Sequence, residues 1–165
     1  MGRHGVSKLT GGWKKAGVAL ELLPAAMNEG LHTKLYETGE MVVEKMVENI
    51  EKQALDWQPL SRFTVEKKGD DTIYVETGWL KDNLDVRRVA TQPNRKRIFI
   101  GASPWKTHDP SGMKFSDLMI LLEYGNPDLG IPARPLVRPT WEQVQEEVRE
   151  ELSDAVEEAM ERGLI

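Results

Sequence analysis

The chain has 165 residues, a length typical of one domain, and no cysteine, which excludes disulfides and thiolate metal sites. Its net charge of −5 is uneven: residues 141–165 hold nine acidic residues and two arginines, a net of −7, which leaves +2 for residues 1–140. This balance is not that of a protein with a global nucleic-acid-binding charge. No apolar run approaches the roughly 18–20 residues of a membrane span, so no membrane partner is expected.

Residues 1–28 contain five glycines, four basic residues and little periodicity. They predict either a flexible N-terminal arm that orders against a partner or a merely disordered terminus. Residues 29–165 are expected to form a single domain.

From residue 31 to residue 54 the sequence is typical of an amphipathic helix. Leu35, Val42, Met46 and Ile50 fall near i, i+4, i+7 spacing on one face, and Gly39 interrupts the pattern only mildly.

Three strands are predicted next. After a connector with a turn signal at residues 67–70, "TIYVE" (72–76) favours a strand that ends at Thr77-Gly78. "LDVRRVA" (84–90) and "KRIFIGA" (96–102) predict two more, joined by a polar turn. Gly78 is expected to supply a turn conformation, and Trp57 and Leu60 to cap the core beneath the first helix. An exposed sheet edge would suit a neighbouring strand.

Two helices complete the chain. A short one is expected at residues 116–124, with Ser116 as N-cap and Asp117 in the first turn. The last begins at Thr140 or Trp141 and ends near Gly163; its apolar stripe is Trp141, Val144, Val148, Leu152, Ala155 and Ala159. The order of elements indicates an α+β domain, with helices packed against a small, mostly antiparallel sheet.

The connector before the last helix is rich in proline. Pro132, Pro135 and Pro139 are expected to stiffen "IPARPLVRP" into an extended strut. The PxxP spacing fits an aromatic groove less well, because such ligands usually lie in disordered tails. Arg134 and Arg138 can project to one side, and two interpretations stay open: pairing with carboxylates of a neighbouring subunit, or with this chain's own acidic helix or solvent.

No catalytic, cofactor or metal site is expected. The three histidines are far apart, and no nucleophile elbow, P-loop or dinucleotide fingerprint occurs. An alternative function, a metal-dependent enzyme built on His108 and Asp109, would need further ligands. Another alternative is a small DNA-binding or DNA-processing accessory protein, based on the basic "NRKRIF" turn and the nearby "VRR".

Three ordered segments resemble a known family. "EYGNPDLGIPARPLVRP" (123–139) resembles the signature of phage virion-morphogenesis and tail-completion proteins, a group of head–tail neck proteins and tail terminators. Upstream, "WQPLSRFTVEKKG" and "ETGWLKDNLDV" are similar to that family's Trp-x-Pro-Leu-Ser and Thr-Gly-x-Leu segments. The matching positions are Trp57, Pro59, Leu60, Thr77, Gly78, Tyr124, Gly125, Pro132 and Pro135. Leu136 departs from the phenylalanine that is frequent in the family.

The resemblance implies a non-enzymatic virion protein that assembles in the host cytoplasm. It implies a homo-oligomeric ring, commonly a hexamer, between the portal or connector complex and the tail tube. Head-side connector proteins, tail-tube or terminator subunits and, in a contractile tail, the sheath would be its partners.

Two hypotheses join this implication to the charges. A closed ring needs two different complementary patches. Arg134 or Arg138 would pair across subunits with Glu146, Glu147 or Glu150, and Tyr124 is a further candidate for this interface. Alternatively, Glu146, Glu150 and Glu157 would face the channel, so that DNA passes without specific binding.

Overall fold

The computed structural model describes residues 12–74, 80–89, 97–108 and 112–163. Its elements are α1 (Gly12–Glu51), α2 (Arg62–Lys68), η1 (Lys81–Asn83), β1 (Leu84–Arg88), β2 (Ile98–Ala102), β3 (Thr107–His108), β4 (Met113–Lys114), α3 (Phe115–Tyr124), η2 (Pro127–Leu129) and α4 (Val137–Gly163). The α+β class is confirmed. None of the helices in this part of the chain has the length and apolar character to cross a membrane.

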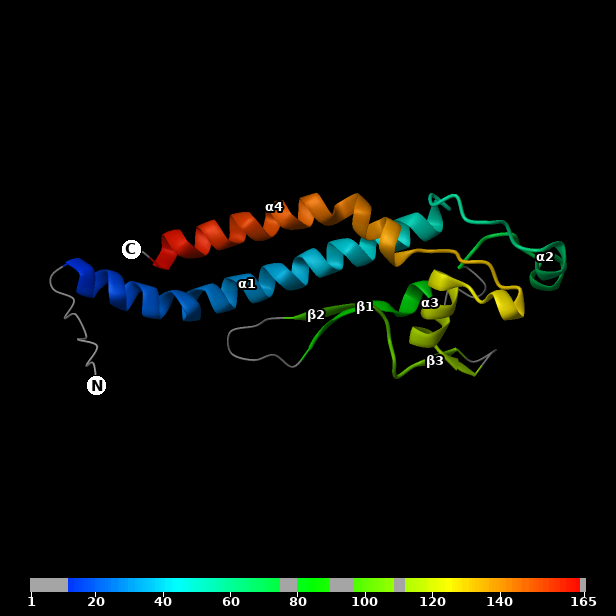
Figure 1. The fold of residues 1–165 in the computed structure, drawn as a ribbon, viewed down its shortest axis with the longest axis horizontal. Helices are drawn as coiled ribbons and strands as arrows, with labels where there is room; N and C mark the ends of the chain where they lie inside the picture. Colours follow the sequence, from blue (N-terminus) through cyan, green and yellow to red (C-terminus); the bar gives the residue numbers. More distant parts are fainter. Residues whose placement is uncertain (1–11, 75–79, 90–96, 109–111, 164–165) are drawn as a thin grey trace, which may run out of the picture.

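The two long helices run side by side in opposite directions. α4 returns along α1, the β1–β2 hairpin lies along another side of α1, and α2 and α3 gather near one end of the helix pair (Figure 1). The connector between α3 and α4 lies at this same end.

The core between the long helices follows the two predicted stripes. Val42, Met46 and Ile50 of α1 are buried, as are Val144 and Val148 of α4. This burial removes apolar surface from water at about 25 cal/mol per Å², which is the main force that holds the pair together.

A polar cluster lies inside this apolar interface. The side-chain amide of Asn49 donates to Thr140 Oγ1 at 2.9 Å and to Gln143 Oε1 at 3.0 Å. Asn49 and Thr140 are both almost fully buried, so these hydrogen bonds fix the register of α1 against the start of α4.

The hairpin confirms the second and third predicted strands. β1 and β2 pair antiparallel, from Leu84 opposite Ala102 to Arg88 opposite Ile98. Gly39 of α1 lets the hairpin approach, because a Cβ there would lie 2.6 Å from Ile98 Cδ1 and 2.8 Å from Val86 Cγ1.

The first part of the chain differs from expectation. α1 begins at Gly12, so the boundary predicted at residue 28 falls inside a helix; residues 1–11 lie outside the described part. The predicted strand at 72–76 is wrong at its start, since Ile73 and Tyr74 form a turn. Its remainder, with Thr77 and Gly78, lies outside the described residues.

The predicted connector after Trp57 contains a helix, α2. Ser61 caps it by accepting from Thr64 N at 3.2 Å, and Gly69 ends it at φ 77°. These two end signals are present in the sequence, but the segment between them is too short to show a helical period.

The later helices start earlier than predicted. α3 begins at Phe115, and the Ser116 hydroxyl contacts Asp117 instead of capping the helix. α4 begins at Val137, which places Pro139 in the first turn, where its missing N–H leaves no intrahelical bond unmade. Trp141 is 44% exposed and does not belong to the buried stripe.

Candidate functional site: the connector and the groove between α3 and α4

The connector leaves α3 through a sharp turn at Gly125. This residue has φ 69° and ψ −176°, a region that is open essentially to glycine alone. A Cβ here would lie 2.6 Å from Ala133 N and 2.7 Å from Ile131 O. Gly125 therefore permits both the turn and the return of the chain against it.

A small closed turn follows. Asn126 N donates to Ile131 O at 2.8 Å, and Ile131 N donates to Asn126 O at 2.9 Å. Between them η2 turns the chain, and residues 132–136 then run without regular secondary structure to the start of α4. The strut predicted over residues 131–139 is therefore wrong at its end, because residues 137–139 already belong to α4.

Glu123, at the end of α3, caps the start of α4. Its Oε2 accepts from Leu136 N at 2.7 Å and Val137 N at 2.9 Å, and its Oε1 accepts from Arg138 N at 3.1 Å. The first amides of a helix lack intrahelical partners and form its positive end, so a buried carboxylate is stabilised there.

Arg134 is buried and serves the chain's own backbone. Its Nε donates to Gln58 O at 2.9 Å and its Nη2 to Pro59 O at 3.2 Å, with only 7% of the residue exposed. Burial lowers the pKa of the guanidinium. The expectation that Arg134 faces a neighbouring subunit, the acidic helix or solvent is therefore wrong.

Two aromatic residues hold the same stretch from the other side. Trp57 Nε1 donates to Pro135 O at 2.6 Å, the Tyr74 hydroxyl donates to Arg134 O, and the two ring centroids are 4.9 Å apart. Burial, and secondarily the charge of Glu123, raises the pKa of Tyr74, which keeps its hydroxyl a donor. We call Trp57, Tyr74, Glu123 and Arg134 the connector anchor.

Tyr74 adopts a left-handed backbone conformation, with φ 67°. This region costs a bulky residue roughly 1–2 kcal/mol. The buried ring contact and the hydrogen bond to the connector compensate for that strain, which ties the segment after α2 to the connector anchor.

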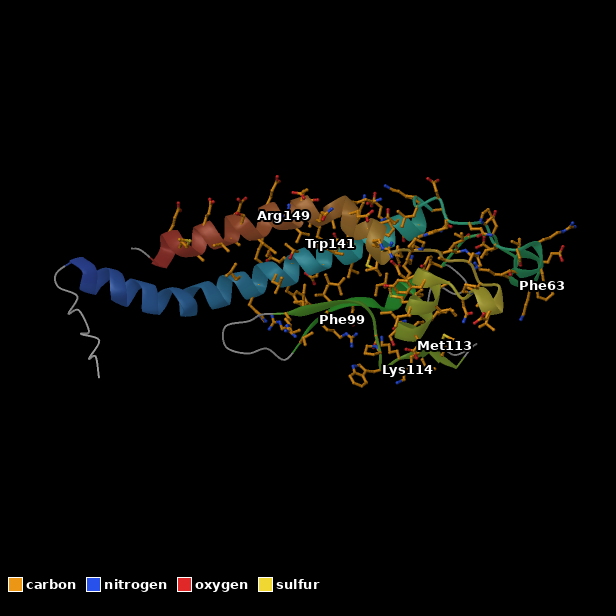
Figure 2. All side chains as sticks on the ribbon, in the orientation of Figure 1. Phe63, Phe99, Met113, Lys114, Trp141 and Arg149 are labelled. Carbon is orange, nitrogen blue, oxygen red and sulfur yellow. The ribbon has the colours of Figure 1, made fainter. Side chains whose placement is uncertain are left out.

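A groove opens next to the anchor, between α3 and the first turns of α4. It has a volume of about 340 Å³ and is lined by Met119, Ile120, Glu123, Tyr124, Val137, Arg138 and Trp141. Four of its apolar residues are well exposed: Ile120 at 59%, Tyr124 at 67%, Val137 at 42% and Trp141 at 44%. Figure 2 shows Trp141 on this early part of α4. Such a patch on one face is typical of an interaction surface.

The groove brings together two of the predicted interface residues, Tyr124 and Arg138. Arg138 is exposed, and its side chain makes no ion pair with another described residue. Of the predicted acceptors, Glu146 pairs with Arg149 at 2.8 Å within α4, whereas Glu147 and Glu150 are exposed. Whether they meet Arg138 of another subunit stays a prediction.

The motif residues near α2 line a second pocket. Trp57, Pro59 and Leu60 contribute to a space of about 590 Å³ at the base of α2. Trp57 is buried and Leu60 packs against the core, which confirms that both cap the core near the end of α1. Pro132 and Pro135 are half-buried in the connector.

The described residues give little support to the two alternative functions, DNA binding and metal-dependent catalysis. Arg87 pairs with Asp85 at 3.1 Å and lies over the Phe99 ring, and Arg88 lies over Tyr36. These contacts occupy two of the arginines proposed to bind DNA, while residues 90–96 lie outside the described part. Within the described chain no three His, Cys, Asp or Glu residues gather as metal ligands; Asp109 lies outside it.

Sequence reasoning missed Glu123 and Tyr74 as anchoring residues. The amides that Glu123 caps are 13 to 15 positions away, beyond the reach of any local capping pattern. The sequence predicts a strand at Tyr74, and the contact of this residue with Arg134 spans 60 positions. The turn at Gly125 returns the connector toward α3, where the Glu123 carboxylate meets these amides.

Comparisons of the chain with models of protein families, with curated proteins and with solved structures found no match. Function is therefore inferred from the residues and their geometry. The most informative contact joins two of the segments that carry the family resemblance. Residues 57–59 and residues 134–135 are far apart in sequence but form hydrogen bonds with each other.

Proposed function

We propose that this chain is a structural protein of a phage virion, which forms a ring at the neck and joins the portal or connector complex to the tail tube. Its role would be tail completion or tail termination, without catalysis. DNA would pass through the ring without specific binding. The subunits would assemble in the host cytoplasm and end in the virion.

One observation carries the proposal. The Trp-x-Pro-Leu-Ser segment and the Ile-Pro-Ala-Arg-Pro segment, which carry much of the family resemblance, form one bonded unit in this fold. Arg134 donates to Gln58 O and Pro59 O, and Trp57 donates to Pro135 O. The two segments are 75 to 78 positions apart, and their direct bonding supports a shared structural motif.

The surface beside this unit is suited to assembly. The connector anchor holds the start of α4 rigidly against α3, which gives the groove fixed walls. Rigid apolar surfaces bind with less loss of conformational entropy than flexible ones. The exposed acidic face of α4 provides carboxylates that a ring interface could use.

Electron microscopy of the purified protein mixed with tail tubes tests the proposal. Negative-stain images should show a ring of protein at one end of each tube, and rotational averaging should give its subunit number. Tubes without the protein serve as the baseline.

An anchor variant sharpens this experiment. Arg134→Lys keeps the charge but loses the two-pronged donation to Gln58 and Pro59, so it should misplace the connector and reduce tube capping. Lys67→Arg on exposed α2 is the matched control and should cap tubes normally. Protein that never engages tubes or portal complexes, in wild type as in variants, would contradict the proposal.

A further inference from the structure

The groove between α3 and α4 sets two requirements for its occupant. Its walls are the exposed apolar side chains Ile120, Tyr124, Val137 and Trp141. Its exposed cation, Arg138, has no ion-pair partner among the described residues, because the nearby Glu123 carboxylate is bound by three backbone amides. The occupant should therefore bring an apolar side chain together with a carboxylate.

The far end of α4 meets both requirements. Met160 is 44% exposed, although it lies on a helix whose outer surface is mainly charged. Glu157 is exposed and makes no ion pair with another described residue. Residues three apart on a helix are neighbours on its surface, so Glu157 stands beside Met160.

These two surfaces cannot meet within one chain. Arg138 and Met160 lie on the same helix, 22 positions apart, a separation of up to about 33 Å along the helix. A contact between the groove and Met160 must therefore join two copies, through different patches on each.

We infer that the groove of one copy receives Met160 of a second copy, with Glu157 of that copy paired to Arg138. The contact is head-to-tail, the kind that generates rings when its rotation closes. It deepens the proposed ring and rests on that proposal, since a ring of identical subunits makes a second copy the expected occupant. Charge complementarity within the chain favours the same occupant.

This contact changes two of the sequence-based hypotheses. The acceptor for Arg138 moves from Glu146, Glu147 and Glu150 to the last turns of α4. Glu157 then lies between subunits and does not face DNA in a channel.

Reversing the two charges tests the contact. Glu157→Arg adds a base near the C-terminal end of α4, and Arg138→Glu adds an acid to its first turn, so both changes suit the helix dipole. Because Arg138→Glu also brings a second carboxylate close to Glu123, urea unfolding of each variant first checks that its fold is intact. Sedimentation velocity over a range of concentrations, up to millimolar, then reports self-association of wild type, each variant and their mixture.

Wild-type protein should form species larger than a dimer as its concentration rises. Each single variant should associate at least tenfold more weakly, because its groove and Met160 patch then carry like charges. An equimolar mixture of the two variants should recover association, since every acidic patch meets a basic groove and every basic patch an acidic groove.

Two charge changes far from the groove serve as controls. Glu44→Arg and Lys67→Glu make the same charge changes on exposed residues of α1 and α2 and should associate like wild type. A wild type that stays monomeric at millimolar concentration, a mixture that does not recover, or weaker association with Glu147→Arg but not with Glu157→Arg would overturn the contact. A closed dimer as the final species would overturn its head-to-tail order.

The contact and the proposed function fail in distinguishable ways. Rings on tube ends that persist unchanged with Arg138→Glu would refute the contact and leave the neck function standing. Charge-dependent self-association in solution, with no engagement of tubes or portal complexes, would support the contact and refute the function.

Discussion

Glu123 performs a task that is usually local. A helix is normally capped by a residue just before its first turn, whereas here a carboxylate from the preceding helix accepts from three consecutive amides, those of Leu136, Val137 and Arg138. The start of α4 is thereby fixed to the end of α3, and the groove between them has a defined width.

Replacing this carboxylate should loosen the start of α4. Glu123→Gln keeps the size of the side chain but loses its charge and turns an N–H₂ group toward amide donors. We expect a loss of about 1–3 kcal/mol in the free energy of unfolding, measured in urea, and faster hydrogen exchange at residues 136–138. Glu147→Gln, on the exposed face, should change stability by less than about 0.5 kcal/mol. Equal effects of the two changes would contradict the capping role.

Two glycines of the connector offer a matched pair. Both have positive φ, 69° at Gly125 and 64° at Gly130, but only at Gly125 would a Cβ collide with backbone atoms. Gly130→Ala should cost about 1–2 kcal/mol for its left-handed conformation. Gly125→Ala should cost clearly more and disturb the groove, as thermal unfolding and near-UV circular dichroism would report. Similar costs for both would mean that the close return of the chain is not needed.

The residues of the site were only partly predictable from sequence. The unusual run of prolines and arginines pointed to the connector, and Gly125 and Trp57 were recognised as motif positions. The role of Arg134 was not, because an arginine beside prolines has no local signal that its partners are carbonyls some 75 positions earlier. Burial of a charged side chain depends on tertiary packing, which spacing does not reveal.

At the scale of elements, Gly39 determines how the hairpin lies on α1. A glycine inside a helix costs roughly 1 kcal/mol relative to alanine, and here it leaves room for Ile98 and Val86. Glycine at this position lowers the intrinsic stability of α1 but allows the hairpin to pack closely against it.

Substitutions at this contact should be coupled. Gly39→Ala should destabilise the protein because its Cβ meets Ile98 Cδ1, whereas Gly39→Ala combined with Ile98→Val, which lacks that atom, should recover part of the loss. The coupling energy should be about 0.5–3 kcal/mol in a double-mutant cycle measured by urea unfolding.

Gly30 of the same helix provides the control. A Cβ there meets nothing within 4 Å, so Gly30→Ala should stabilise the protein by up to about 1 kcal/mol. Additive behaviour of Gly39 and Ile98 would show that the hairpin adjusts freely and that close packing does not constrain it.

Elements with a clear hydrophobic period could be predicted from the sequence. Short elements, and helix ends that depend on tertiary contacts, could not. The stripes of α1 and α4 and the alternating strands β1 and β2 were found because each buries one face. α2 could not be predicted, because none of its seven residues is fully buried and its sequence therefore shows no hydrophobic period. The start of α4 was misplaced because the prolines obscured it, while Glu123 caps the helix from a distance.

At the scale of the whole molecule, α4 is polarised along its length. The groove with Arg138 lies at its start, and Met160 with Glu157 lies near its end. A subunit with different patches at two ends of one rigid element can bind a neighbour on each side, which is the requirement for a ring of identical copies.

The proposed contact should respond to salt in a characteristic way. An exposed Arg138–Glu157 pair is screened as ionic strength rises, whereas burial of Met160 is not. Wild-type self-association should therefore weaken with added sodium chloride but persist. The neutral variant Arg138→Gln/Glu157→Gln should associate more weakly at low salt and depend less on salt; an equal salt slope for both proteins would contradict the pairing.

The connector anchor also determines which amino-acid substitutions this fold can tolerate during evolution. Three of its side chains donate to main-chain carbonyls and the fourth accepts from main-chain amides, and every residue other than proline supplies both groups. Substitutions at Gln58, Pro59, Pro135 or Leu136 can therefore preserve the bonds, while substitutions at Trp57, Tyr74, Glu123 or Arg134 cannot. A descendant of this chain could replace most of its residues and still fasten its last helix in the same way, recognisable by four side chains and a glycine in an otherwise unrelated sequence.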